Sequence, residues 1–179
     1  MIKYTADMHL GHVNIIKHDG RPFSNVDIMD KILLENYNNE VNKDDEVYID
    51  GDLIYRSGKH PTWYLDQMPG HKHLILGNHD KIILEDKSLW HYFEEIDKIL
   101  TIKDNGRMVV ISHCPMAEWD GYFRGWYHVY AHIHNNLNKA YHFMKEEERA
   151  LNAGCMINDY KPVTLDELII NNTKFKKTH

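Results

Sequence analysis

Five short segments rich in Asp, His and Asn constrain the fold of this chain more than any other feature. In chain order they are Asp7-Met8-His9, Gly51-Asp52, Gly77-Asn78-His79-Asp80, His113 and His132-Ile133-His134. Each of them follows a run of residues that reads as a β-strand, such as Ile2 to Ala6 before the first. Because ligands of open α/β sheets bind at the carboxyl ends of the strands, we expect all five segments to meet at one edge.

The spacing inside these segments suits metal binding. Asp7 and His9 are two residues apart, and so are His132 and His134. At the end of a strand, alternate residues point the same way, so both members of a pair can face one ion. Asp52 has two carboxylate oxygens and can therefore bridge two cations.

An amide and two glycines complete the pattern. Asn78 offers a neutral carbonyl oxygen, and Gly51 and Gly77 remove side-chain bulk where the backbone turns sharply. Mixed imidazole and carboxylate ligands suit zinc, iron or manganese better than calcium or magnesium. Two such ions ~3.5–4 Å apart would hold a phosphoryl group and lower the pKa of a bridging water, which would attack phosphorus in line.

Apolar periodicity predicts an alternation of strands and helices. The predicted strands are 2–6, 46–49, 73–76, 99–103, 108–112 and 128–132. The predicted helices are one beginning at Ser24, 61–68, 82–93 in pieces, and Thr164 to about Asn171, with Ser24–Asp27 and Thr164–Glu167 as capping pairs. Asn105-Gly106 predicts a hairpin turn. We expect an α/β protein with helix-covered sheet layers and a single domain over 1–179, with a disordered tail of only a few residues after Asn172.

Composition excludes several classes of protein. The formal net charge is −6, which argues against broad binding to nucleic acid or anionic membrane but allows one phosphorylated ligand in a local pocket. No apolar run approaches the ~18 residues that span a bilayer, and no signal peptide is evident. Two cysteines do not form a disulfide framework. We therefore expect a cytoplasmic protein, and the oligomeric state stays open.

In this order, the five segments resemble the calcineurin-like metallophosphoesterase superfamily, whose pattern is D-x-H, GD, GNH(D/E), H and GHxH. The resemblance runs from Asp7 to His134. Chain length, Gly11-His12-Val13-Asn14-Ile15-Ile16 and Arg21-Pro22-Phe23 are similar to small bacterial and phage members. The resemblance implies a two-sheet β-sandwich flanked by helices (α/β/β/α) and a dinuclear metal-dependent phosphoric ester hydrolase that acts on phosphodiesters or phosphomonoesters.

The resemblance also assigns roles. It implies one ion held by Asp7, His9, Asp52 and His134, and a second held by Asn78, His113 and His132 with Asp52 bridging. The two divalent ions would be manganese, iron, zinc or nickel. His79 would act as general acid or stabilise charge on the phosphoryl oxygens, and Asp80 would orient its ring.

Three departures from the family pattern stand out. Ala131 occupies the usual glycine position of the last segment, and we expect only a modest backbone shift there. Tyr55 stands where the protein phosphatase branch has a second Asp, which weakens a protein-phosphatase interpretation. Cys114 follows His113 without a C-x5-R loop after it, so we expect a buried, inert thiol rather than a nucleophile.

Several residues outside the five segments have both a functional and a structural interpretation. Arg56, Arg21 and Arg124 are candidates to bind a phosphate, with surface salt bridges as the alternative. His12 and His128 lie near the motif segments, and we expect neither to have a role at the site. The aromatic residues of 119–127 would form a lid, a stacking surface for a nucleobase, a dimer contact or packing over the sheet edge, and we favour packing or a dimer contact.

The sequence therefore predicts hydrolysis of a small phosphorylated substrate, with a lean towards phosphodiesters or nucleotide-like compounds. A rival interpretation is a non-catalytic metal-binding scaffold or interaction module on the same fold. A third is a mononuclear metallohydrolase, which would bind one ion per chain.

Overall fold

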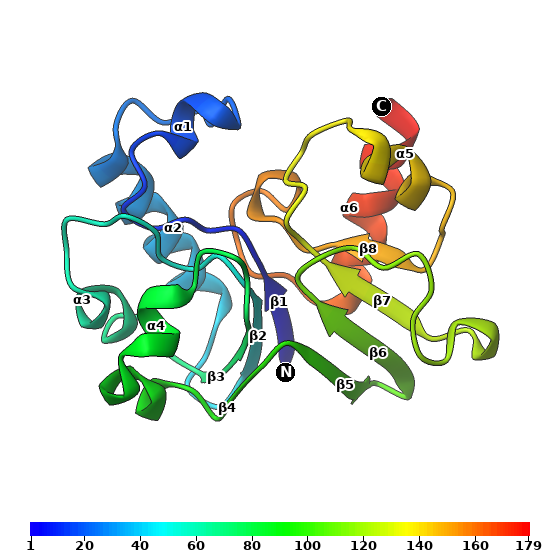
Figure 1. Ribbon diagram of the computed structural model, residues 1–179, viewed down its shortest axis with the longest axis horizontal. Coiled ribbons are helices and arrows are strands. Elements are labelled where there is room, and N and C mark those ends of the chain that lie inside the picture. Colours follow the sequence, from blue (N-terminus) through cyan, green and yellow to red (C-terminus); the bar gives the residue numbers. More distant parts are fainter.

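The computed structural model describes residues 1–179 as a mixed α/β fold with two four-stranded sheets, each flanked by helices (Figure 1). The first sheet is parallel and has the order β1 (Ile2–Thr5), β2 (Glu46–Asp50), β3 (His71–Ile75) and β4 (Glu95–Asp97). The second has the order β5 (Ile99–Asp104), β6 (Arg107–Ser112), β7 (Tyr127–Tyr130) and β8 (Ala150–Asn152). In this second sheet, β5 and β6 pair antiparallel, and the other neighbouring strands pair parallel.

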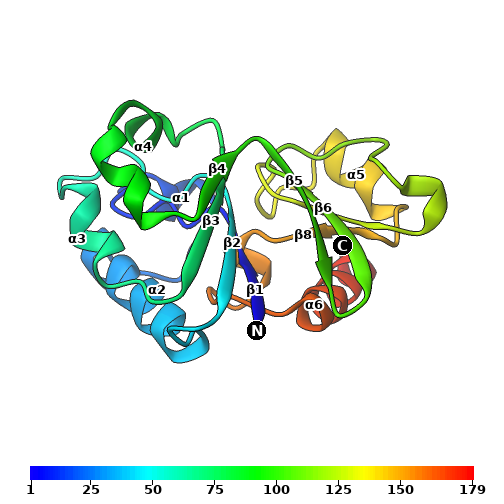
Figure 2. The same ribbon diagram turned by 90° about the horizontal axis from the view of Figure 1, so that it is seen from below.

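Figures 1 and 2 show most helices on the two outer sides of the sheets. Beside the first sheet lie α1 (Ile15–His18), α2 (Val26–Glu40), α3 (Pro61–Leu65), α4 (Lys81–Glu85) and the 3-10 turn η1 (Lys87–Tyr92). Beside the second lies α5 (Lys139–Lys145), with the 3-10 turns η2 (Tyr122–Arg124) and η3 (Cys155–Ile157) in the connections. The last helix, α6 (Leu165–Thr178), contacts both β1 and β8 and contributes Leu165 and Leu168 to the core between the two sheets. None of the helices has the length and hydrophobicity that a membrane crossing requires.

Alternation along β2 explains how the first sheet is buried on both faces. Val47 and Ile49 pack with Leu33 of α2, whereas Tyr48 between them packs with Val109 of the second sheet. Successive residues of a strand point to opposite faces, so one short strand supplies two separate apolar cores. The two sheets therefore pack against each other through a core of their own.

Aromatic residues of the 119–127 stretch pack on the outer face of the second sheet. Trp119 is buried, and its Nε1–H donates to the Trp126 carbonyl oxygen at 3.0 Å. The Tyr122 hydroxyl donates to Glu147 at 2.9 Å. Trp119 and Tyr122 belong to an apolar cluster with Val110 of β6 and Tyr130 of β7, which agrees with packing over the sheet, while Phe123 is 86% exposed.

The parallel strands bring the five motif segments together, as the sequence predicts. The segments after β1, β2, β3, β6 and β7 leave the carboxyl ends of their strands at one edge. The Asp7 amide donates to the Gly51 carbonyl at 3.1 Å, and the Ala131 amide donates to the His113 carbonyl at 2.9 Å. A bridge between Ala6 and Gly154 connects the first sheet to the residues after β8.

Several predicted elements differ from the structure at their ends. The helix predicted from Ser24 begins at Val26, because the Asn25 side chain rather than Ser24 accepts the Ile28 amide hydrogen at 2.9 Å. The last helix continues to Thr178 and not to about Asn171. Tertiary contact explains the extension, since the Lys176 ammonium donates to two carbonyls near β8 at 2.7 and 2.8 Å.

The capping pair Thr164–Glu167 is confirmed, with both reciprocal hydrogen bonds present. We expect Thr164→Ala to lower the free energy of unfolding by about 1 kcal/mol, because the Glu167 amide loses the hydroxyl that accepts its hydrogen bond. Urea denaturation measures the loss as a lower midpoint at unchanged m value. Thr173→Ala, at an exposed position of the same helix, is the control, and equal midpoints for both variants would contradict the capping role.

Candidate metal centre

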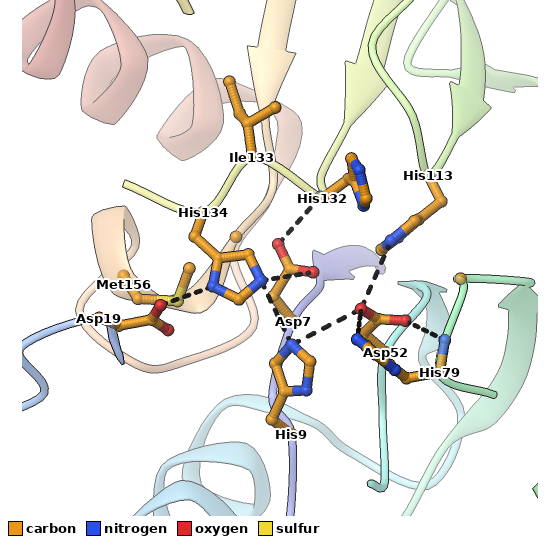
Figure 3. A network of polar contacts seen from close by, with 12 residues as sticks. Asp7, His9, Asp19, Asp52, His79, His113, His132, Ile133, His134 and Met156 are labelled. Carbon is orange, nitrogen blue, oxygen red and sulfur yellow. Dashed lines mark hydrogen bonds and ion pairs between the residues drawn. The ribbon is translucent and has the colours of Figure 1, made fainter. Parts of the chain in front are cut away.

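The structure brings the side chains of the seven predicted ligands together: Figure 3 shows six of them facing one another, and Asn78 contacts two of these, His113 and His132. Ligand atoms of Asp7, His9, Asp52 and His134 all lie within 4.8 Å of one another. The Asp52 Oδ2 atom is 3.6 Å from His9 Nε2 and 3.6 Å from His113 Nε2. This first group could hold a metal ion, in agreement with the ligand set that the sequence implies.

A second group lies on the other side of Asp52. The Asn78 Oδ1 atom is 2.8 Å from His132 Nδ1 and 3.3 Å from His113 Nε2. Because His113 also approaches Asp52, the two groups are continuous. Asn78 and His132 are exposed, whereas Asp52 and His113 are buried, so the centre opens on the side of the second group.

The backbone of the site adopts a conformation that non-glycine residues rarely take. Five of the predicted ligands have positive φ angles: Asp7 (52°), His9 (50°), Asp52 (53°), His132 (68°) and His134 (54°). Such backbone costs of order 1–3 kcal/mol per residue and persists where surrounding structure enforces it, typically at functional sites. The two residues of each pair, Asp7 with His9 and His132 with His134, therefore do not face one side because of a regular strand. The left-handed backbone of each loop directs their side chains into the site.

Glycines allow the two central loops to approach closely, as the sequence predicts. A Cβ on Gly51, which has φ +78°, would lie 2.5 Å from His113 Nδ1. A Cβ on Gly77 would lie 2.3 Å from Asp52 Oδ1. Both distances are shorter than any real contact of a Cβ, so only glycine fits at either position.

The donor set fits a divalent cation. The His9 and His134 Nε2 atoms face each other at 3.3 Å, close to the ~3.4 Å that separates two nitrogens around a tetrahedral ion with ~2.1 Å bonds. Burial raises the pKa of Asp7 to about 6, and its Oδ1 atom is buried without a hydrogen-bond partner. Burial lowers the pKa of His9 well below its usual value, which keeps the imidazole neutral as a metal ligand requires.

Two imidazoles are held in the tautomer that leaves Nε2 free for an ion. His113 Nδ1–H donates to the Asp50 carbonyl at 2.8 Å, and His134 Nδ1–H donates to Asp19 Oδ1 at 2.7 Å. Burial acts to raise the pKa of Asp19, but the hydrogen bond from His134 and the charge of Arg21 outweigh it and lower that pKa. An ionised Asp19 thus orients the His134 ring, a role that sequence reasoning missed because Asp19 lies in no motif.

Arg21 is not available to a phosphate, so its prediction as a substrate contact is wrong. The residue is buried, and its guanidinium donates to the Asp7 and Met8 carbonyls at 2.8 Å each. Its remaining donors contact Asp19 Oδ2 at 2.9 and 3.0 Å. The planar guanidinium of Arg21 therefore holds the segment after β1 and the carboxylate of Asp19, which contacts His134.

The other two arginines differ in their positions. Arg56 is exposed and lines a cavity of about 440 Å³ together with His9, His79, His132 and His134, among other residues. Arg124 lines a separate hollow of about 650 Å³ beside Trp119 and Phe123, which shares no residue with the first. Arg56 thus lies at the cavity beside the candidate ligands, whereas Arg124 does not line it.

Asp80 does not orient the His79 ring, and this part of the prediction is wrong. The Asp80 carboxylate instead accepts backbone hydrogen bonds from Asp52 and Gly77 at 2.8 Å each and from Leu53 at 3.0 Å. His79 stays at the cavity, with its Nε2 atom 4.0 Å from Asp52 Oδ2. The Asp80 carboxylate therefore holds two loops together. The His79 imidazole is in contact with other residues.

Three further residues near the motifs have definite environments. His128 is buried and satisfied, because Nδ1–H donates to the Val110 carbonyl at 3.2 Å and Nε2 accepts from the Met116 amide at 3.1 Å. His12 lines the same cavity as the motif histidines, although the sequence favoured no role for it. Cys114 is exposed, so the prediction of a buried thiol is wrong; partial burial and nearby carboxylates nevertheless raise its pKa, which disfavours the nucleophilic thiolate.

No family model matches the chain. The chain is 36% identical over 166 residues to the uncharacterized protein MJ1445 of Methanocaldococcus jannaschii, covering 92% of this chain and 86% of that protein. It is also 36% identical over 80 residues to the gene 66 protein of Mycobacterium phage L5, covering 43% of this chain and 38% of the phage protein.

A solved structure supports the arrangement of the two sheets. The protein of unknown function AQ665 from Aquifex aeolicus is 27% identical, with a TM-score of 0.73 over 93% of this chain and 96% of that one. Pseudomonas putida nuclease MPE (17% identical, over 74% of this chain and 60% of that one) and an archaeal phosphodiesterase (15%, over 73% and 72%) are more distant, with TM-scores of 0.42 and 0.40. A likeness at that level carries no weight for function.

We expect Asp19→Ala to weaken metal binding by about 10- to 100-fold, because the His134 ring loses the partner that fixes its tautomer and orientation. Competition titration with zinc on the metal-stripped protein measures the change. Asp27→Ala removes an exposed carboxylate of α2 and is the control. Equal zinc affinities for the two variants would show that Asp19 does not support the metal centre.

Proposed function

We propose that this chain, which belongs to the family of the uncharacterized protein MJ1445, is a metal-dependent phosphoric ester hydrolase. The observation that carries the proposal is the pair of ligand groups joined through Asp52 and His113. One group would hold the first ion through Asp7, His9, Asp52 and His134. The other would hold the second ion through Asn78, His113, His132 and the same Asp52.

Two divalent ions in these positions would lower the pKa of water and stabilise the negative charge of a phosphoryl group. Manganese, iron, zinc or nickel suits the mixed nitrogen and oxygen donors. We also place the chain in the calcineurin-like metallophosphoesterase superfamily, with its two sheets as the α/β/β/α sandwich of one domain over 1–179. The chemistry of the donor set and the order of the motifs support this assignment.

The residues around the ligands supply the remaining functions. His79 lies at the cavity with a part-exposed ring, where Nε2 can donate a proton to the leaving oxygen or a hydrogen bond to a phosphoryl oxygen. Arg56 makes no hydrogen bond or ion pair within the chain, so its guanidinium is free to bind phosphoryl oxygens in a bidentate manner. Asp80 supports both loops and takes no part in proton transfer.

The shape of the site favours a small phosphorylated substrate. A cavity of about 440 Å³ with exposed Asn78 and His132 beside it accommodates a phosphate ester and part of its organic group. A formal net charge of −6 does not favour long nucleic acids. Phosphodiesters and nucleotide-like esters are therefore the first substrates to test.

We expect activity to depend on added metal. The protein is stripped of metal, reloaded separately with manganese, zinc, iron, nickel or magnesium, and assayed with p-nitrophenyl phosphate and bis-p-nitrophenyl phosphate. Turnover that returns with one or more ions, at about two ions per chain, supports the proposal. One ion per chain with turnover favours the mononuclear alternative, and two bound ions without turnover on either ester favour the non-catalytic scaffold.

We expect His79→Gln to lower kcat by about 10²- to 10⁴-fold while leaving metal content unchanged, because the variant cannot transfer a proton. Elemental analysis and initial rates on the reloaded protein measure both quantities. His142→Gln, on the exposed part of α5, is the matched control and should keep the original rate. Unchanged turnover in His79→Gln would remove His79 from the mechanism.

A further inference from the structure

Tyr55 lies against the ring of His79. The two ring centroids are 3.9 Å apart with an angle of 39° between the planes, which is the shortest aromatic separation at the site. Both residues line the same cavity. Rings at this distance are in van der Waals contact, so the Tyr55 ring limits the positions that the His79 imidazole can take.

No side chain makes a hydrogen bond to the His79 ring, and its one other ring contact, edge-on with His9, is longer, at 5.5 Å and 60°. Asp80, its neighbour in sequence, is occupied by three backbone amides. The Asp52 Oδ2 atom is 4.0 Å from His79 Nε2, beyond hydrogen-bond distance. The only hydrogen bond from His79 to Asp52 comes from the backbone amide, at 2.8 Å, and it places the main chain without orienting the imidazole.

Tyr55 itself is held from several sides. Its amide donates to the Leu10 carbonyl at 3.2 Å, beside the bridge between Leu10 and Ile54. The ring of His12 meets the Tyr55 ring edge-on, at 4.8 Å and 84°. The Arg56 guanidinium lies 5.1 Å from the centroid of the Tyr55 ring. The Tyr55 ring is therefore a fixed surface within the site.

The Tyr55 side chain contacts its neighbours through the ring, and no hydrogen bond involves its hydroxyl. Its contacts with His79, His12 and Arg56 all involve the aromatic ring. The ring, and not the phenol, is thus the part of Tyr55 that acts on His79.

We propose that Tyr55 is a positioning residue, which holds the His79 imidazole in its reactive orientation through ring contact instead of a carboxylate hydrogen bond. This inference rests on the proposed function for its effect on turnover, but the ring contact itself does not. Phenylalanine at this position should retain the positioning, whereas alanine should lose it.

An experiment independent of activity tests the contact. In the zinc-loaded full-length protein, the His79 Cε1–H resonance is assigned by its disappearance in His79→Gln. We expect Tyr55→Ala to move this resonance towards the position of an exposed histidine, because the ring current of Tyr55 is lost. Tyr55→Phe should leave it nearly in place. An unmoved resonance in Tyr55→Ala would overturn the inference.

Kinetics with bis-p-nitrophenyl phosphate test the consequence. We expect Tyr55→Ala to lower kcat by about 10²-fold with little change in KM, since a misplaced catalytic group reduces the rate and not the binding. Tyr55→Phe should keep most of the original kcat. Tyr92→Ala, a half-buried tyrosine on η1 outside the cavity, is the matched control and should keep the original kcat.

A double-mutant cycle separates positioning from direct substrate binding. If Tyr55 acts through His79, Tyr55→Ala causes no further loss of kcat in a His79→Gln background. Independent losses that multiply, or a rise in KM alone, would show that Tyr55 contacts the substrate and would overturn the inference. If no ester is hydrolysed with any ion, the proposed function fails, and the His79 resonance alone decides on Tyr55.

Discussion

One buried carboxylate, that of Asp80, fixes the distance between the two central loops of the site. It accepts hydrogen bonds from amides of the loop after β2 and of the loop after β3. Burial raises the pKa of Asp80, and the amide donors oppose that rise, so its ionised form depends on both loops staying in place. Because Gly51 and Gly77 leave no side chain between these loops, Asp52 reaches the imidazoles of both ligand groups.

The site also joins the two sheets. Asp7, after β1, accepts the His132 amide hydrogen at 3.1 Å, and Asn152 at the end of β8 donates to the His134 carbonyl at 2.8 Å. Ligands after β1, β2 and β3 come from the first sheet, and those after β6 and β7 come from the second. Neither sheet carries a complete group, so an ion bound here would stabilise their association as well as the loops.

Polar residues close to a ligand in sequence are not always those that act on it. Asp80 and Arg21 hold backbone segments, although the sequence suggests roles towards His79 and phosphate. Asp19 orients His134, and Tyr55 contacts His79, although neither belongs to a motif. Burial strengthens the hydrogen bonds of Asp80 and Arg21, so the residues that support a candidate ligand matter as much as the ligand itself.

The sequence by itself determined the kinds of candidate metal ligand and their order along the chain. It also predicted most strands, the hairpin at Asn105-Gly106 and the Thr164 cap, because these depend on residues a few positions apart. It missed α1, β4, α5 and β8, which are all short elements. Only the tertiary structure decided which side chain supports which ligand. Such pairs join loops far apart in sequence, and their contacts depend on how the two sheets and their loops pack, which no local pattern specifies.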